Sequence, residues 1–181
     1  MTETEFIEQV KKLGLSPTDN QLKKLNQLYE IMIEENKVMN LTRIVEKEDV
    51  YLKHFYDSLT ITKVCDFSKI ETLCDVGTGA GFPGLVLKIF FSDVKITLVD
   101  ALQKRVNYLN KVINMLELEK IEAIQIAFYR LISIISNSIS PAGTFTITLS
   151  PNFFPTKACA IGVWIDNFPS LKFASVSETR V

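Results

Sequence analysis

Hydrophobic residues recur at helical spacing through the first third of the chain. The residues at this spacing are Leu22, Leu25, Leu28, Met32 and Ile33. It predicts a long amphipathic helix that ends near Val38. Residues 16–19 supply a hydroxyl cap, a proline at the first helical position and a carboxylate, so the helix should begin there. We also predict a shorter helix over 3–13 and a third over 50–64, which follows an acidic cluster at 46–49.

From residue 69 onward, short apolar runs alternate with helical patterns. The apolar runs predict strands over 70–76, 95–100 and 121–124. The helical patterns between them predict helices over 85–91 and 103–116. This alternation is typical of a βαβαβ unit, which requires a parallel sheet with helical crossovers. We therefore predict an α/β, Rossmann-like fold with an N-terminal helical extension.

A glycine cluster follows the first predicted strand directly, at residues 77–84. In an open parallel sheet, ligands bind outside the carboxyl ends of the strands. Gly77, Gly79 and Gly81 lack the Cβ atoms that would hold a ligand away from the backbone. Asp100 ends the next strand, where its carboxylate can accept two hydrogen bonds from a ribose diol. These residues predict a site for a nucleoside-bearing ligand.

Two cofactor classes fit this cluster. Residues 79–84 satisfy the G-x-G-x-x-G fingerprint of dinucleotide-binding proteins, which is a weak signal by itself. Asp75 favours a methyl donor instead, because residues 75–81 resemble the first motif of S-adenosylmethionine-dependent methyltransferases. An NAD-binding Rossmann oxidoreductase stays open as the alternative. The simplest interpretation, that the glycines only permit tight packing of strand on helix, is weakened by the strand, helix and aspartate around them.

Four segments in succession resemble a single family. They are residues 36–42, 54–59, 75–84 and 98–109. Over about residues 6–124 the chain resembles, in register, the RsmG (GidB) family, which methylates guanine N7 in bacterial small-subunit ribosomal RNA. The resemblance implies a Rossmann-like S-adenosylmethionine-dependent methyltransferase fold.

The same resemblance implies a cofactor, a site and a partner. S-adenosyl-L-methionine would be the methyl donor, in contact with Gly77 and Phe82 and with its ribose at Asp100. The predicted cofactor-binding residues are therefore Gly77, Gly79, Gly81, Phe82 and Asp100, and no catalytic or metal-binding residue is assigned. The predicted partner is small-subunit ribosomal RNA or the ribosomal subunit, and we expect a cytoplasmic monomer.

The resemblance stops after residue 124. The charged residues beyond it are only Arg130, Lys157, Asp166, Lys172, Glu178 and Arg180. The family's later segments, including a Ser-Arg-Ala sequence, have no counterpart here. We hypothesise that this part derives from a shifted reading frame or a degraded gene, so a non-catalytic remnant is a further alternative. The predicted organisation is a helical cap over 1–66, the first half of a methyltransferase domain over 67–124, and a divergent tail over 125–181.

The composition favours a folded, soluble protein. Hydrophobic residues make up 47% of the chain and charged residues 23%, and no apolar run approaches the ~18 residues that span a bilayer. The first five residues are polar and acidic, unlike a secretory signal. A net charge of −1 argues against a globally basic nucleic-acid binder.

A few other side chains carry chemistry of their own. The three cysteines lack metal-ligand spacing, so we expect reduced thiols. His54 is the only histidine, and we expect it to pack or cap a helix. Asp57 should brace the helical cap or face solvent. Lys104, Arg105 and Lys111 would either meet RNA phosphates or form a solvated helix face.

Overall fold

The structure is a computed structural model that describes residues 1–126 and 163–164. Its N-terminal part contains α1 (Glu3–Lys12), α2 (Asp19–Met39), a helical run that starts at Lys47, and the 3-10 helix η3 (Phe67–Lys69). The remainder contains β1 (Thr72–Val76), α5 (Gly84–Phe90), β2 (Lys95–Asp100), α6 (Gln103–Met115), β3 (Ile121–Gln125) and β4 (Val163–Trp164). The predicted α/β architecture with its N-terminal helices is confirmed.

Both N-terminal helices begin with a capping box. At α2, the Thr18 Oγ1 atom accepts the N–H of Gln21 at 3.3 Å, and Gln21 Oε1 accepts the N–H of Thr18 at 2.8 Å. The start predicted within 16–19 is therefore confirmed, but the prediction that puts the proline, Pro17, at the first helical position and so the cap at Ser16 is wrong, because the cap is Thr18. The reciprocal pair requires a hydroxyl three residues before Gln21, and that residue is Thr18.

The third predicted helix is divided into four pieces. They are α3 (Lys47–Val50), the π-helix η1 (Tyr51–Tyr56), α4 (Asp57–Leu59) and the 3-10 helix η2 (Thr60–Lys63). The π turn buries Tyr51 and Phe55, whose ring centroids lie 5.0 Å apart. Single π turns within helices often mark functional sites, and this one carries His54.

Three strands form the parallel core of the sheet, in the order β3-β2-β1. Cys74 of β1 lies opposite Thr97 of β2, which lies opposite Glu122 of β3. The predicted βαβαβ unit is thus confirmed. β4 pairs with the other edge of β1 in the antiparallel direction, which the βα alternation does not predict.

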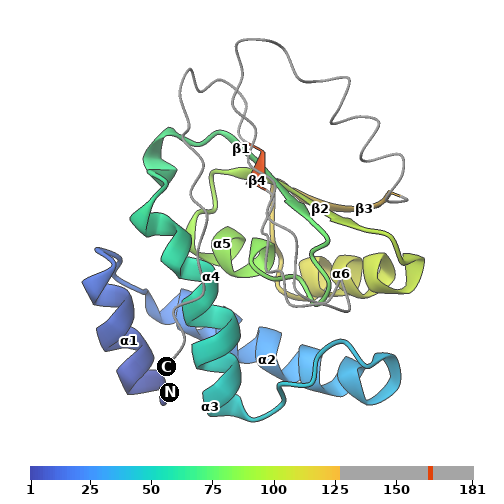
Figure 1. Ribbon diagram of the computed structural model, residues 1–181, viewed down its shortest axis with the longest axis horizontal. Coiled ribbons are helices and arrows are strands. Elements are labelled where there is room, and N and C mark those ends of the chain that lie inside the picture. Colours follow the sequence, from blue (N-terminus) through green and yellow to red (C-terminus); the bar gives the residue numbers. More distant parts are fainter. Residues whose placement is uncertain (127–162, 165–181) are drawn as a thin grey trace, which may run out of the picture.

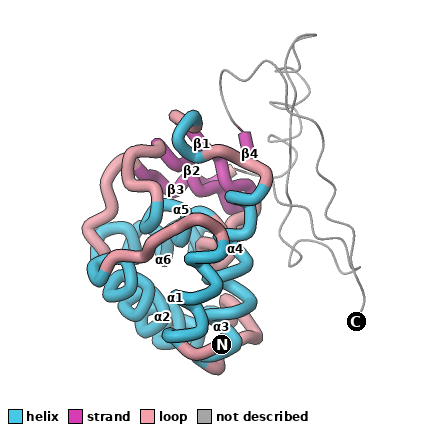
Figure 2. The backbone as a smooth tube through the Cα atoms, turned by 90° about the vertical axis from the view of Figure 1, so that its left-hand side faces the viewer, coloured by secondary structure: helices cyan, strands magenta, loops and turns pink. Residues whose placement is uncertain are grey.

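The described residues form three layers (Figures 1 and 2). Helices α5 and α6 cover one face of the sheet, and the N-terminal helices lie beyond them. One continuous core joins the layers, from Phe6 and Leu28 in the N-terminal helices to Leu87 in α5 and Ile96 in β2. The helical extension therefore packs directly against the helices that follow the glycine loop.

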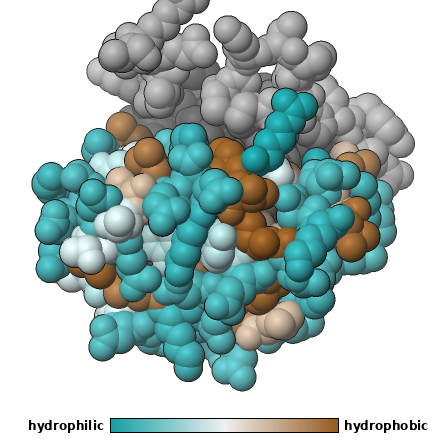
Figure 3. Space-filling model, turned by 90° about the horizontal axis from the view of Figure 1, so that it is seen from below, coloured by the Kyte–Doolittle hydropathy of each residue, from teal (hydrophilic) through white to brown (hydrophobic). Residues whose placement is uncertain are grey.

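The outer surface of the N-terminal layer is largely hydrophilic (Figure 3). Hydrophobic residues gather in a band near the middle of that view. Among residues 1–126 and 163–164, no helix combines the length and the apolar character needed to cross a membrane.

Candidate functional site

The turn between β1 and α5 has a backbone that favours glycine at three positions. The φ angles of Gly77, Gly79 and Gly81 are 76°, 59° and 97°, all in the left-handed region that side-chain-bearing residues rarely adopt. The N–H groups of Gly77 and Thr78 donate to the carbonyl oxygen of Val99 at 2.8 and 3.1 Å. The turn is therefore fixed to the carboxyl end of β2, as expected for a ligand-binding loop of a parallel sheet.

Asp75, near the end of β1, holds the loop through two hydrogen bonds. Its Oδ2 atom accepts the hydroxyl of Thr78 at 2.6 Å and the N–H of Gly84 at 2.9 Å. The carboxyl group is 2% exposed, and this burial raises its pKa to about 6 although the two hydrogen bonds favour the charged form. Asp75 thus joins the two ends of the loop, a role that the sequence pattern does not specify.

The glycines of the loop serve different purposes. A Cβ atom on Gly81 would lie 2.1 Å from Leu85 Cδ1, and one on Gly84 would lie 2.2 Å from Leu98 Cδ2. Packing therefore opposes a side chain at both positions, through Leu85 of α5 at Gly81 and through Leu98 of β2 at Gly84. Among the residues that the structure describes, a Cβ on Gly79 would approach only the Gly77 carbonyl oxygen, at 3.8 Å. Packing thus explains two of the glycines but not Gly79.

Asp100 lies against this loop. Its Oδ2 atom accepts the N–H of Gly79 at 3.1 Å, and its Oδ1 atom accepts the N–H of Leu102 at 2.8 Å. Arg105 Nη1 lies 3.4 Å from Oδ2 and forms an ion pair with a carboxylate that is 1% exposed. The structure therefore brings together the glycine and the acid that the sequence predicts as neighbours.

Phe82 lies in the loop and is stacked on His54. The two ring centroids are 4.5 Å apart and the ring planes differ by 8°. Phe55 touches Phe82 from another direction, with centroids 5.9 Å apart. Burial lowers the pKa of His54 to about 4, so the imidazole is neutral at neutral pH. His54 packs against an aromatic ring, as the sequence analysis expected, but its partner on the loop was not foreseen.

Two of the three basic side chains on α6 are engaged in ion pairs. Arg105 binds Asp100, and Lys111 Nζ lies 2.6 Å from Glu35 Oε1 of α2. Lys104 is exposed. Arg105 therefore belongs to the site through its aspartate, and Lys111 joins α6 to the N-terminal layer.

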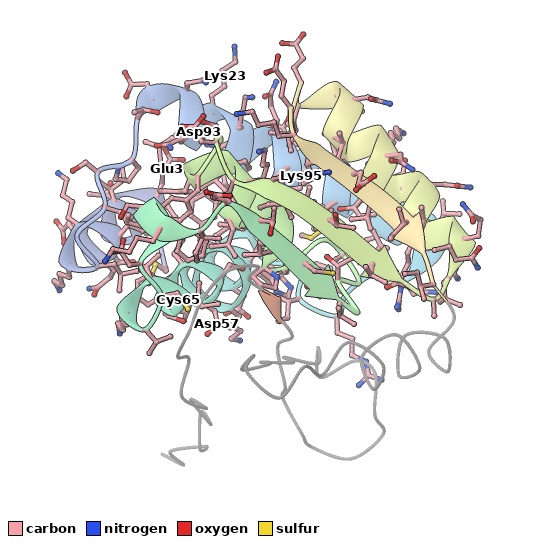
Figure 4. All side chains as sticks on the ribbon, turned by 90° about the horizontal axis from the view of Figure 1, so that it is seen from above. Glu3, Lys23, Asp57, Cys65, Asp93 and Lys95 are labelled. Atoms are coloured by element: carbon pink, nitrogen blue, oxygen red, sulfur yellow. The ribbon has the colours of Figure 1, made fainter. Side chains whose placement is uncertain are left out.

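The remaining candidate side chains, Asp57 and the cysteines, make none of the loop contacts described above. Asp57 is exposed, and Figure 4 shows it with Cys65 on the opposite side of the molecule from Lys23. Cys65 and Cys74 are free thiols, and burial raises the pKa of Cys74 to about 11, so it stays protonated. Cys159 lies outside the described residues. No group of three or more possible metal ligands occurs in the described part of the chain.

The sequence matches a known protein family. A model of the family GidB, rRNA small subunit methyltransferase G, matches residues 21–129. The chain is 47% identical over 119 residues to Ribosomal RNA small subunit methyltransferase G of Exiguobacterium sibiricum, a match that covers 66% of this chain and 50% of that protein.

Other relatives carry the same name. The identity is 49% over 126 residues with the protein of Leuconostoc mesenteroides, covering 68% of this chain and 53% of the relative. It is 50% over 115 residues with that of Bacillus velezensis, covering 64% and 48%. The chain thus spans about half the length of the curated relatives it matches. The glycine loop, its aspartates and the helices around them lie within the matched residues, and the chain belongs to the GidB family, rRNA small subunit methyltransferase G.

Proposed function

We propose that the loop of residues 77–84 and Asp100 bind S-adenosyl-L-methionine. The observation that carries the proposal is the hydrogen bond between the Gly79 N–H and Asp100, at the carboxyl ends of two adjacent parallel strands. The backbone of Gly79, which has no side chain, thus lies next to the buried carboxylate of Asp100. Parallel sheets of this kind bind nucleosides at this edge. The family match supports a methyl donor over a dinucleotide.

The residues present fit an adenosyl group. No packing contact among the described residues requires Gly79 to be glycine, so its missing Cβ leaves space for a ligand to approach the backbone. A carboxylate accepts about four hydrogen bonds. Asp100 uses three of these with Gly79, Leu102 and Arg105, which leaves acceptor capacity for a ribose hydroxyl. The proposed cofactor-binding residues are Gly77, Gly79, Gly81, Phe82 and Asp100.

The proposed reaction is methylation of guanine N7 in small-subunit ribosomal RNA. Bound S-adenosylmethionine would supply an electrophilic methyl group on a sulfonium. Guanine N7 already carries a lone pair, so the chain needs no general base and contributes mainly by orientation. Positioning of this kind lowers barriers by about 7–11 kcal/mol in well-oriented reactions. N7 faces the deep, narrow major groove of A-form RNA, so the target guanine should be unstacked or lie in an irregular loop.

The proposed organisation assigns the RNA-facing side to the helical cap over residues 1–66 and the cofactor to residues 67–124. Residues 125–181 are proposed to derive from a shifted reading frame, and the family match, which ends at residue 129, supports this. On this view the chain binds the cofactor, while full activity requires a family-like second half. Sequencing the gene tests the frameshift. If no insertion or deletion of one or two nucleotides restores a family-like tail, the frameshift is contradicted.

Calorimetry with the full chain separates the proposed cofactor from its rival. We expect S-adenosylhomocysteine to bind and NAD to give no heat of binding. Asp100→Asn should weaken S-adenosylhomocysteine binding, while Asp93→Asn, at an exposed aspartate before β2, should not. Binding of NAD without binding of S-adenosylhomocysteine would overturn the assignment.

Methyl transfer tests the reaction itself. The substrate is small ribosomal subunits that lack the modification, with a labelled methyl donor. The chain is compared with a chimera in which residues after 124 are replaced by the corresponding half of the Bacillus velezensis relative. We expect the chimera to methylate guanine N7 and the unmodified chain to be much less active. A chimera that binds the donor but leaves N7 unmodified would exclude the proposed reaction.

A further inference from the structure

The stack between His54 and Phe82 is the end of a longer series of contacts. His54 Nε2 and Thr42 Oγ1 share a hydrogen bond of 3.1 Å. The same Oγ1 atom accepts the N–H of Ile44 at 3.1 Å, which fixes the rotamer of Thr42. The ring of His54 is thereby held at its edge by Thr42 and covered on one face by Phe82.

The series begins in α2. Asn36 Oδ1 accepts the N–H of Thr42 at 2.9 Å, across the turn that ends the helix. Asn40 makes this turn possible by adopting a left-handed conformation with φ of 52°, which asparagine tolerates better than most residues. We name Asn36, Thr42, His54 and Phe82 the His54 contact chain. It runs from Asn36, near the end of α2, to Phe82 in the glycine loop.

The hydrogen bond distinguishes this arrangement from ordinary packing. An apolar ring at position 54 would fill the same space, but nothing would fix the plane of that ring. Here the bond from Thr42 to Nε2 restrains the imidazole, and the nearly parallel planes of the two rings pass this restraint to Phe82. Phe82 is in turn tied to the loop, because its N–H donates to the Thr78 carbonyl oxygen at 3.1 Å.

We infer that His54 is a positioning residue: through the His54 contact chain, the N-terminal helices fix the orientation of Phe82 and with it the conformation of the glycine loop. The inference rests on the proposed function in one respect, since Phe82 is there a cofactor contact. The N-terminal helices thus help to shape the cofactor site without touching the cofactor. His54 itself transfers no proton.

Two readouts test this inference on the full chain. The first is the affinity for S-adenosylhomocysteine, measured by calorimetry. His54→Leu, which removes the flat ring, should weaken binding about three- to tenfold, the range of an aromatic pair. His54→Phe, which restores a flat ring but not the hydrogen bond to Thr42, should recover only part of the loss. Lys53→Ala, an exposed neighbour that pairs with Asp49, is the matched control and should leave the affinity unchanged.

The second readout needs no cofactor. The Gly81 and Phe82 N–H groups both donate to the Thr78 carbonyl oxygen, so their amide exchange reports on the loop. His54→Leu should accelerate this exchange more than about tenfold and leave the Ile96 amide in β2 protected. If His54→Leu does not fold, Thr42→Val keeps both rings and should give a smaller change in the same direction.

The outcomes separate the inference from the proposed function. A wild-type chain that fails to bind S-adenosylhomocysteine, with loop amides that still respond to His54→Leu, contradicts the proposed function and supports the contact chain. Unchanged exchange at Gly81 and Phe82 in both His54→Leu and Thr42→Val overturns the inference. Equal losses of affinity in His54→Phe and His54→Leu also overturn it, because the ring would then have no role.

Discussion

The N–H of Gly84 donates to the Oδ2 atom of Asp75 across 2.9 Å, so the strand before the glycine loop holds the first residue of α5. Asp75→Ala leaves this N–H and the Thr78 hydroxyl without their buried partner. Because each unpaired buried group costs about 1–3 kcal/mol, the free energy of unfolding should fall by roughly 2–4 kcal/mol. Urea unfolding monitored by circular dichroism measures this change.

The control for Asp75 is an exposed aspartate with a similar set of partners. Asp66 accepts hydrogen bonds from Ser68 and pairs with Lys69 at the surface. Asp66→Ala should cost clearly less than Asp75→Ala, because solvent screens an exposed pair. A loss at Asp75 no larger than the loss at Asp66 would contradict the bracing role.

Alanine at two glycines of the loop should separate stability from binding. Gly81→Ala introduces a Cβ 2.1 Å from Leu85 at a φ of 97°, so we expect a loss of roughly 3 kcal/mol or more in the free energy of unfolding. Gly79→Ala meets no close neighbour in the described residues, at a φ of 59°, so the conformational cost should be about 1–2 kcal/mol.

The affinity for S-adenosylhomocysteine should be more sensitive to alanine at Gly79 than the stability is. Gly79→Ala should weaken S-adenosylhomocysteine binding by about tenfold or more, because the new methyl group occupies space proposed for the ligand. Gly14→Ala, at a φ of 82° with no neighbour within 4 Å in the described part of the chain, controls for the conformational cost alone. Normal affinity in Gly79→Ala would argue that Gly79 does not face the cofactor.

His54 should make stability depend on pH. Burial lowers its pKa from 6.5 to about 4, so between these values the unfolded chain binds a proton that the folded chain does not. Stability from this group is complete above about pH 6.5 and is lost as the pH falls toward 4. The loss should reach roughly 2–3 kcal/mol near pH 4.5.

Asp75 titrates over an overlapping range with the opposite effect. Its pKa is raised from 3.8 to about 6, so the folded chain binds the extra proton and gains stability as the pH falls through 6. The His54 term is therefore measured as the difference between wild type and His54→Gln in urea unfolding. That difference should shrink from about pH 7 to about pH 4.5, and a constant difference would contradict the lowered pKa of His54.

Arg105 should support the affinity of the site through Asp100. The ion pair is 3.4 Å long with the carboxylate almost fully buried, so Arg105→Ala leaves that charge less compensated. We expect S-adenosylhomocysteine affinity to fall about threefold to tenfold, as measured by calorimetry. Lys104→Ala, at an exposed neighbour on the same helix, should have no effect. Equal effects of the two substitutions would indicate a general contribution of charge instead.

The sequence predicts the elements whose signals are local. β2 has the predicted bounds because its apolar run ends in a carboxylate, and α6 differs from its prediction by one residue. The π turn within 51–56 could not be predicted, because the same hydrophobic positions suit a continuous α-helix. The antiparallel direction of β4 depends on pairing with a distant strand, which hydrophobic pattern does not encode.

In the site, too, some features could be predicted from the sequence and others could not. The meeting of the glycine loop with Asp100 could be predicted, since parallel strands end at one edge of a sheet. The pairing of His54 with Phe82 could not, because it depends on how the N-terminal helices pack on the loop. The roles of Gly81 and Gly84 also required coordinates, because only the neighbouring leucines show why a side chain is excluded.

The leucines that contact Gly81 and Gly84 have a consequence for what a glycine signature can reveal. The packing around both glycines opposes a side chain there, whether or not the chain modifies a substrate. Folding alone is therefore a reason to retain these two glycines, independent of catalysis. In this chain, Gly81 and Gly84 therefore report on how α5 packs, and binding of a cofactor has to be tested at Gly79 and Asp100.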